Sequence, residues 1–298
     1  MGKLLAEAFA PARETFQEVD DALSQKLSAL MWEGPESDLT LTENAQPAIM
    51  AASIAVIRVL QKEGGLDIGR HARLVAGHSL GEYSALCAAG AFTLADTARL
   101  LKIRGRAMQS AVPVGEGAMI ALIGADIETA EAVAREAGMP GGVCVVANDN
   151  APGQVVLSGS KDAMDRVAEI AKAKGVKRAI PLAVSAPFHC PLMQPAADAM
   201  RDALAQVTIR PLAAPVLANV TAAQTSEPDM VRRLLVEQVT GRVRWRESML
   251  ALKGLGVDTT VEMGGGKVLT GMVKRIDKDL QTLTLDTPDE IETFAKAL

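Results

Sequence analysis

Ser79 lies in the stretch VAGHSLGEYSAL, residues 75–86, between Gly77 and Gly81 in a G-x-S-x-G pattern. This pattern is typical of a nucleophilic serine on a sharp turn between a strand and a helix. Two glycines and a serine also fall into this spacing by chance, so the motif alone identifies no chemistry. The short apolar run ARLVAG before the serine predicts a buried strand, and the small residues after it predict a helix. This context favours a nucleophile.

A serine hydroxyl is a poor nucleophile until a base removes its proton. His78 adjoins Ser79, and adjacent side chains on a tight turn generally point apart. His189, in SAPFHC, comes directly before a helix that begins at about Pro191. Residue 189 follows a segment, 116–183, that we expect to form a small inserted domain. A histidine at such a junction could reach across a cleft and act as the base, and the alternative is a histidine with a purely structural role. Cys190 is a rival nucleophile, but it adjoins His189, and side chains of adjacent residues generally point apart.

Arg104 belongs to the segment LADTARLLKIRGRAMQSA, which has helical spacing. It falls on the apolar face, between Leu101 and Met108. A charged side chain is rarely buried unless it is paired, so Arg104 needs the carboxylate of the protein or of a ligand. A guanidinium pairs bidentately with a carboxylate, so an inward arginine beside a serine nucleophile indicates an acyl group with its own carboxylate. The opposite, solvated face is expected to carry Arg99, Lys102 and Arg106.

The elements that must position these residues alternate between helix and strand. The first ~65 residues read as helical, with Gln46-Pro47 opening a long apolar helix and Gly64-Gly65 ending it. Residues 117–183 follow the order β-α-β-β-α-β of a ferredoxin-like unit, and α/β alternation resumes afterwards. We therefore expect an α/β fold in which residues 1–115 and 184–298 form a large domain with a parallel sheet. Residues 116–183 form the inserted small domain.

Composition excludes several function classes. The 298 residues carry a formal net charge of -5, which disfavours nucleic acid as a partner. No apolar stretch approaches the ~20 residues that a membrane span needs. The three histidines form no metal motif, and GGGK at 264–267 lacks the pattern of a phosphate loop and predicts a tight turn. Cys87, Cys144 and Cys190 read as reduced thiols. We expect a cytoplasmic, monomeric enzyme without metal or cofactor.

Six ordered segments carry a resemblance that covers nearly the whole chain. They are GHSLGEYSAL, IRGRAMQ, GQVVLSGS, SAPFHC, LLVEQ and GGGKVLTGMVKRI. Together they resemble the malonyl-CoA:acyl carrier protein transacylases of bacterial fatty acid synthesis. The resemblance implies an α/β-hydrolase-like large domain with a ferredoxin-like small domain. It also implies ping-pong transfer of a malonyl group from malonyl-CoA, through a malonyl-serine, to the phosphopantetheine thiol of acyl carrier protein.

The resemblance also implies roles for individual residues. Ser79 corresponds to the acylated nucleophile, His189 to its base and Arg104 to the residue that binds the malonyl carboxylate. Gln238, in LLVEQ, corresponds to the residue whose backbone carbonyl orients the histidine. The backbone N–H of Leu80 is expected to stabilise the oxyanion. His78 is placed with the substrate-binding residues, and Phe188 is expected to crowd the malonyl α-carbon and disfavour methylmalonyl.

The chain departs from the family pattern at its start. The family opens with a strand and an F-P-G-Q-G segment that supplies a second oxyanion donor, whereas this sequence begins Met1-Gly2-Lys3-Leu4. Loss of one such donor costs ~10²–10³ in rate. We therefore expect the true start to lie upstream; the alternative is a weakened, carrier-binding relative.

Two further alternatives concern function and surface. A serine hydrolase or thioesterase usually has its histidine late in the chain, but no histidine follows His189. A neutral ester would also leave Arg104 without a role. The arginines at 242, 244 and 246, around Trp245, form either a solvated face or a contact for carrier protein or coenzyme A phosphates.

Overall fold

The computed structural model describes residues 1–184 and 186–298. The N-terminal part is helical, as predicted, and comprises α1 (Lys3–Ala8), α2 (Ala10–Leu23), α3 (Leu27–Glu33), α4 (Glu36–Leu39) and α5 (Thr42–Glu63). Gly64 ends α5 as expected, but Pro47 does not open it. The helix begins at Thr42 and runs through the proline, because its apolar faces are buried against α2 and α8 (Leu94–Ser110). That burial outweighs the backbone hydrogen bond that proline removes.

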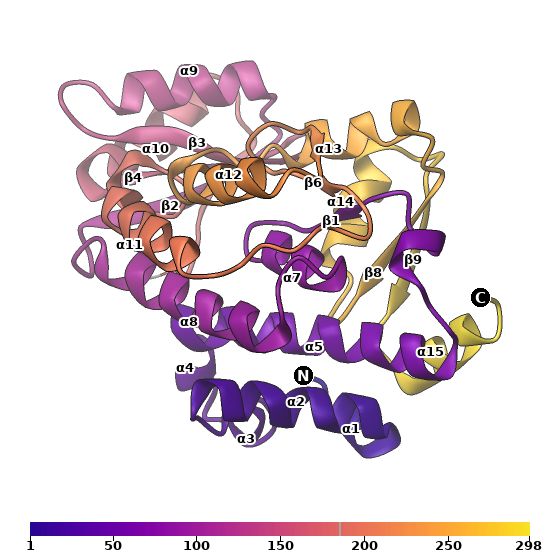
Figure 1. The fold of residues 1–298 in the computed structure, drawn as a ribbon. Helices are drawn as coiled ribbons and strands as arrows, with labels where there is room; N and C mark the ends of the chain where they lie inside the picture. Colours follow the sequence, from indigo (N-terminus) through magenta and orange to yellow (C-terminus); the bar gives the residue numbers. More distant parts are fainter. Residues whose placement is uncertain (185) are drawn as a thin grey trace.

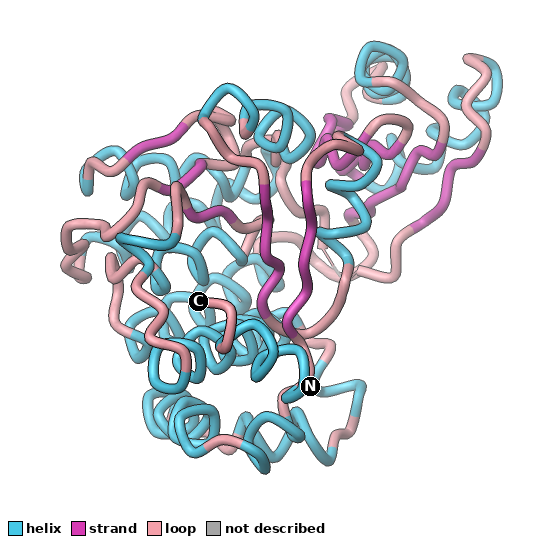
Figure 2. The backbone as a smooth tube through the Cα atoms, turned by 90° about the vertical axis from the view of Figure 1, so that its right-hand side faces the viewer, coloured by secondary structure: helices cyan, strands magenta, loops and turns pink. Residues whose placement is uncertain are grey.

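Two small sheets lie on the side of α5 opposite to α2 (Figure 1). In the first, β1 (Val75–Ala76) pairs in parallel with β6 (Val216–Leu217), which pairs antiparallel with β7 (Gln224–Thr225). In the second, β8 (Thr259–Met263) and β9 (Gln281–Leu285) are parallel and run side by side, facing the viewer in Figure 2. A cavity of about 660 Å³ lies between β1 and β8, lined by residues of both strands and by apolar side chains of α5. The expected parallel sheet is thus present as two separate parallel pairs.

Residues 117–181 form a distinct packing unit with the predicted order of elements. They comprise β2 (Gly117–Ile123), α9 (Ile127–Ala137), β3 (Cys144–Ala151), β4 (Gln154–Ser160), α10 (Lys161–Ala173) and β5 (Arg178–Pro181). The strands form one antiparallel sheet in the order β3-β4-β2-β5. Apolar residues of α9 and α10 pack on this sheet and form a core of their own, including Leu122, Val133, Leu157 and Val167. Figure 1 shows this unit at the upper left.

The remaining α-helices belong to the part of the chain outside the antiparallel unit. They are α6 (Ile68–His71), α7 (Gly81–Ala88), α11 (Gln194–Ala205), α12 (Pro228–Thr240), α13 (Trp245–Ala251), α14 (Val268–Ile276) and α15 (Pro288–Ala295). The glycines of GGGK make the tight turn predicted between β8 and α14. No helix in the described part of the chain is long and apolar enough to cross a membrane.

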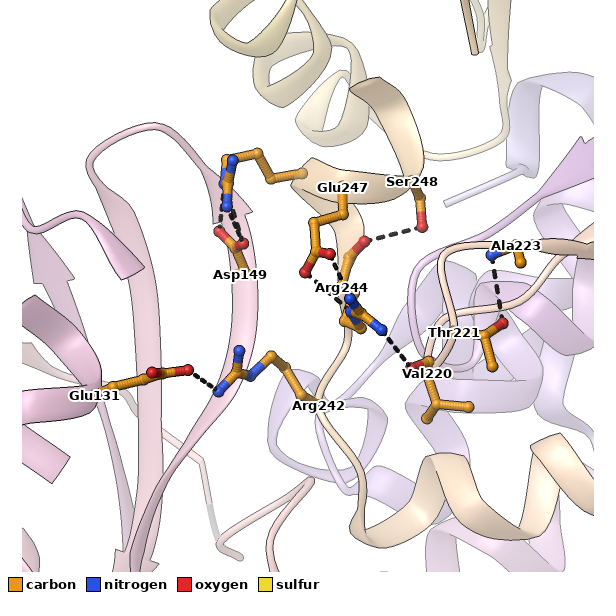
Figure 3. Close-up of polar contacts among 10 residues, drawn as sticks. Glu131, Asp149, Val220, Thr221, Ala223, Arg242, Arg244, Glu247 and Ser248 are labelled. Carbon is orange, nitrogen blue, oxygen red and sulfur yellow. Dashed lines mark hydrogen bonds and ion pairs between the residues drawn. The ribbon is translucent and has the colours of Figure 1, made fainter. Parts of the chain in front are cut away.

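The arginine-rich segment 242–246, which leads into the first turn of α13, fastens the antiparallel unit to the rest of the chain (Figure 3). Arg242 pairs with Glu131 of α9 at 2.7 Å, and Arg246 pairs with the buried Asp149 of β3 at 2.9 Å. Between them, the backbone N–H of Asp149 donates to the carbonyl of Val243 at 2.9 Å. Arg244 pairs with Glu247 within its own segment. The three arginines, considered above as a solvated face or a docking surface, therefore each have a carboxylate partner within the chain.

Candidate active site

Ser79 lies on a sharp turn between β1 and α7, in the predicted strand–turn–helix context. Its φ of 53° is in the left-handed region, which side-chain-bearing residues rarely adopt. The turn closes so tightly that a Cβ at Gly77 would stand 2.0 Å from the carbonyl oxygen of Gly81. Glycine at 77 is therefore required for the turn that projects the serine.

His189 reaches the serine from a segment 110 residues further along the chain. Its Nε2 lies 2.8 Å from Ser79 Oγ, and its Nδ1 lies 2.8 Å from the backbone oxygen of Gln238. A carbonyl oxygen can only accept, so Nδ1 carries the proton of the neutral ring and Nε2 presents its lone pair to the serine. Burial, and then the nearby Arg104 cation, lower the pKa of His189 to about 3. The imidazole is therefore neutral near pH 7, and the lone pair of Nε2 faces the serine hydroxyl.

Arg104 lies inward as predicted, with 1% of its surface exposed. Its Nη2 donates to Ser79 Oγ at 3.1 Å and to the side-chain oxygen of Gln238 at 2.9 Å, while Nη1 donates to Gln46 Oε1 at 2.7 Å. Within residues 1–184 and 186–298, no carboxylate forms an ion pair with Arg104, and its buried Nε has no acceptor. Burial lowers the pKa of the guanidinium. The site thus holds a buried cation beside the nucleophile with hydrogen-bonding capacity left for an anionic ligand.

One prediction about this helix is wrong. Lys102 was expected on the solvated face of α8, but only 9% of it is exposed. Its Nζ donates to Asn44 Oδ1 at 2.7 Å and to Gln25 Oε1 at 2.9 Å, and forms an ion pair with Glu43. The physical reason is that α2 and α5 cover two sides of α8, so the buried stripe is wider than periodicity indicated.

His78 points away from the serine hydroxyl. Its Nε2 lies 2.8 Å from Asn150 Oδ1 of β3, and its ring packs against Trp245 with centroids 5.6 Å apart. It therefore connects the turn to the antiparallel unit instead of acting on Ser79. Cys190 also turns away, because its Sγ donates to the backbone oxygen of Pro187.

The other two predicted residues occupy different settings. Leu80 directly precedes α7, and its backbone N–H has no acceptor among the described residues. Phe188 is half-buried and packs against apolar residues of the large core and of the antiparallel sheet.

Sequence reasoning missed four polar residues of the site: Gln46, Glu82, Asn219 and Asn150. Asn219 accepts from the backbone N–H of Ser79 at 2.7 Å and donates to the backbone oxygen of Gly77 at 2.8 Å. Glu82 bonds both Asn219 and Gln238. Only Glu82 carried a local signal, because it lies three residues after the serine within the same motif. Among the described residues, no cluster of three or more His, Cys, Asp or Glu could hold a metal ion.

A serine hydroxyl, a neutral imidazole and a buried guanidinium thus meet at one point, which defines a serine acyl-transfer site. The family model for the acyl transferase domain matches residues 1–285. The malonyl CoA-acyl carrier protein transacylase of Bacillus subtilis is 43% identical over 298 residues, covering 100% of this chain and 92% of that protein.

Solved structures agree with this match. An acyl-carrier-protein-S-malonyltransferase from Bartonella henselae matches with a TM-score of 0.97 and 54% identity, covering 100% of this chain and 94% of that one. A malonyl-transacylase solved in complex with its type II PKS acyl-carrier protein matches with a TM-score of 0.95 and 41% identity, covering 100% and 95%. The chain belongs to the acyl transferase family and, within it, to the malonyl CoA-acyl carrier protein transacylases.

Proposed function

We propose that the chain transfers a malonyl group from malonyl-CoA to the phosphopantetheine thiol of acyl carrier protein. One observation carries the proposal: the hydroxyl oxygen of Ser79 lies 2.8 Å from His189 Nε2 and 3.1 Å from Arg104 Nη2. The first contact activates the hydroxyl, and the second puts a cation where the carboxylate of a short diacid thioester would extend. The family membership supports the same reaction.

The first half-reaction makes a malonyl-serine. His189 Nε2 takes the proton of Ser79 Oγ as the oxygen attacks the thioester carbonyl carbon of malonyl-CoA. The carbon–sulfur bond then breaks, and the imidazolium returns the proton to the departing thiolate of coenzyme A. In the second half-reaction the carrier thiol gives its proton to His189 as its sulfur attacks the ester carbonyl carbon. The bond from that carbon to Ser79 Oγ then breaks, and the imidazolium returns the proton to the serine oxygen. Gln238 assists both steps, because its backbone oxygen holds the Nδ1 proton and keeps Nε2 facing the serine.

The tetrahedral intermediate needs donors for its oxyanion. The backbone N–H of Leu80 suits this role because it follows the nucleophile and lacks an acceptor among the described residues. The N–H of Ser79 itself is occupied by Asn219 Oδ1 at 2.7 Å.

Arg104 accounts for the choice of acyl group. The malonyl carboxylate would satisfy its guanidinium, whereas acetyl-CoA would leave this buried cation without an anion. Phe188 is proposed to crowd the malonyl α-carbon and exclude a methyl branch. Phe188→Ala should then raise the methylmalonyl-to-malonyl ratio, and an unchanged ratio would remove this role. His78 is proposed to help shape the substrate pocket from the side of Asn150.

We also propose how the chain divides into two domains. Residues 1–115 and 184–298 would form an α/β-hydrolase-like domain and residues 116–183 a ferredoxin-like one, supported by the strand order β3-β4-β2-β5. Three free cysteines suit a cytoplasmic enzyme.

Intact-mass analysis after incubation with malonyl-CoA tests the function. The unmodified chain should gain one malonyl group and lose it when carrier protein with its phosphopantetheine arm is added, while Ser79→Ala gains none. Ser84→Ala, in the helix α7 that directly follows the turn, is the matched control and should still be malonylated. Loss of the adduct to water as fast as to carrier protein would instead identify a hydrolase. Absence of the adduct in the unmodified chain would refute acyl transfer.

A further inference from the structure

Glu82 is a buried carboxylate in the site for which the acyl-transfer steps above require no role. It lies in the first turn of α7, with 2% of its surface exposed. One of its oxygens, Oε2, accepts from the side-chain amide of Gln238 at 2.8 Å and from the backbone N–H of Asn219 at 3.1 Å. Both partners are themselves buried.

These two partners hold the rest of the machinery. Asn219 accepts from the backbone N–H of Ser79 at 2.7 Å. The amide nitrogen of Gln238 also donates to the backbone oxygen of Ser79 at 2.9 Å, and its amide oxygen accepts from Arg104 at 2.9 Å. A single carboxylate oxygen therefore accepts from two residues that hold the serine backbone, and one of them, Gln238, also holds the arginine together with Gln46.

The direction of the Gln238 amide is the critical feature. Its NH₂ faces two acceptors, Glu82 Oε2 and the backbone oxygen of Ser79, while its oxygen faces the guanidinium of Arg104. A reversed amide would set its NH₂ against a cation that can only donate. Its oxygen would face the backbone oxygen of Ser79, which can only accept, and the carboxylate of Glu82, which only accepts when ionised. Such an arrangement would push Arg104 from its place beside Ser79.

We propose that Glu82 is a positioning residue for malonyl selectivity. By accepting from Gln238 it keeps the amide oxygen directed at Arg104, and by accepting from Asn219 it holds the backbone of the nucleophile. This inference rests on the proposed malonyl transfer. Burial raises the pKa of Glu82 to about 7, and both the ionised and the protonated carboxyl offer an oxygen that accepts. The positioning role of Glu82 therefore requires a hydrogen-bond acceptor at this place and does not require a negative charge.

The test compares rates of Ser79 acylation by malonyl-CoA and acetyl-CoA in three variants. Glu82→Leu removes the acceptor, and the malonyl-to-acetyl ratio should fall by about tenfold to a hundredfold, the effect of misplacing a reacting group by ~1 Å. Glu82→Gln retains one oxygen that can accept from both partners and should keep the ratio within about threefold of the parent. Thr15→Val, which removes a buried hydrogen bond within α2, is the control for general destabilisation and should not change the ratio.

Glu82→Asp keeps the test decisive if the leucine variant does not fold. Its carboxylate is one methylene shorter and cannot reach both partners, so the ratio should fall by about threefold or more. An unchanged ratio in a folded leucine or aspartate variant would overturn the inference, as would an equal loss in the leucine and glutamine variants. If the unmodified chain is not malonylated at all, the proposed function fails instead, which separates the two outcomes.

Discussion

Replacement of Arg104 by methionine isolates the contribution of the buried cation. The unbranched apolar side chain fills most of the same volume and removes the guanidinium that lies 3.1 Å from Ser79 Oγ. In the described part of the chain, Arg104 and His189 are the two side chains that can carry a positive charge within hydrogen-bond distance of Ser79 Oγ. Since His189 is neutral at pH 7, the change removes the cation beside the nucleophile. We expect malonyl-CoA to lose its preference over acetyl-CoA.

The magnitude follows from the burial of the pair. Removing one partner of a buried, hydrogen-bonded charge pair costs about 2–5 kcal/mol. At 1.4 kcal/mol per factor of ten, the rate of Ser79 malonylation should fall by roughly 30-fold to several-thousand-fold. Acetylation should stay level or rise, because acetyl-CoA no longer leaves a buried cation without an anion. The ratio of the two rates cancels any change in the fraction of folded protein.

The assay is rapid-quench intact mass spectrometry with each thioester on the unmodified chain and two variants. Arg106→Met is the matched control, since Arg106 lies on the same helix but pairs at the surface with Glu43. Its malonyl-to-acetyl ratio should equal that of the unmodified chain. An equal fall of both rates in Arg104→Met, or a preference that persists within twofold, would refute a carboxylate-binding role.

Four other results can be predicted. Because the pKa of His189 is lowered to about 3, acylation by the free enzyme should stay level from neutral pH to roughly pH 5; a decline centred at 6.5 in a pH–rate profile would contradict a buried neutral base. The same shift means that the unfolded state binds more protons between pH 3 and 6.5, so His189→Gln should reduce the loss of unfolding free energy as the pH falls through that range. Glu82 changes the pH dependence of the unfolding free energy in the opposite direction, because its pKa is raised from 4.5 to about 7. Between these pH values the folded state binds more protons than the unfolded state, so this contribution to stability is lost as the pH rises. Glu82→Gln should therefore be stabilising above pH 7 relative to its effect below pH 4.5. Arg246→Met leaves the buried Asp149 unpaired and should cost about 3 kcal/mol in urea unfolding, against about 0–1 kcal/mol for Arg242→Met at its more exposed pair; equal costs would refute this account of the contact between the units.

The sequence by itself determined the features that depend on neighbouring residues. The glycines around Ser79 required a tight turn after a strand, and helical spacing placed Arg104 on a buried face. The order of the elements in residues 117–181 was also readable, because its helices have helical spacing of apolar residues and its strands are short apolar runs separated by turn residues. These are local properties, since the period of two or 3.6 residues is set by the backbone of a single element.

Only the tertiary structure decided which residues meet. Spacing along the chain left two histidines as candidate bases, and the resemblance favoured His189; the fold brings that residue to Ser79 and turns His78 toward Asn150. The same is true of Lys102, whose burial depends on two helices that cover α8 from different sides. Hydrogen-bond partners far apart in the chain are selected by how elements pack, and periodicity reports the face of an element but not its neighbour. The amide and carboxylate that hold Ser79 and Arg104 in place therefore emerged only in three dimensions.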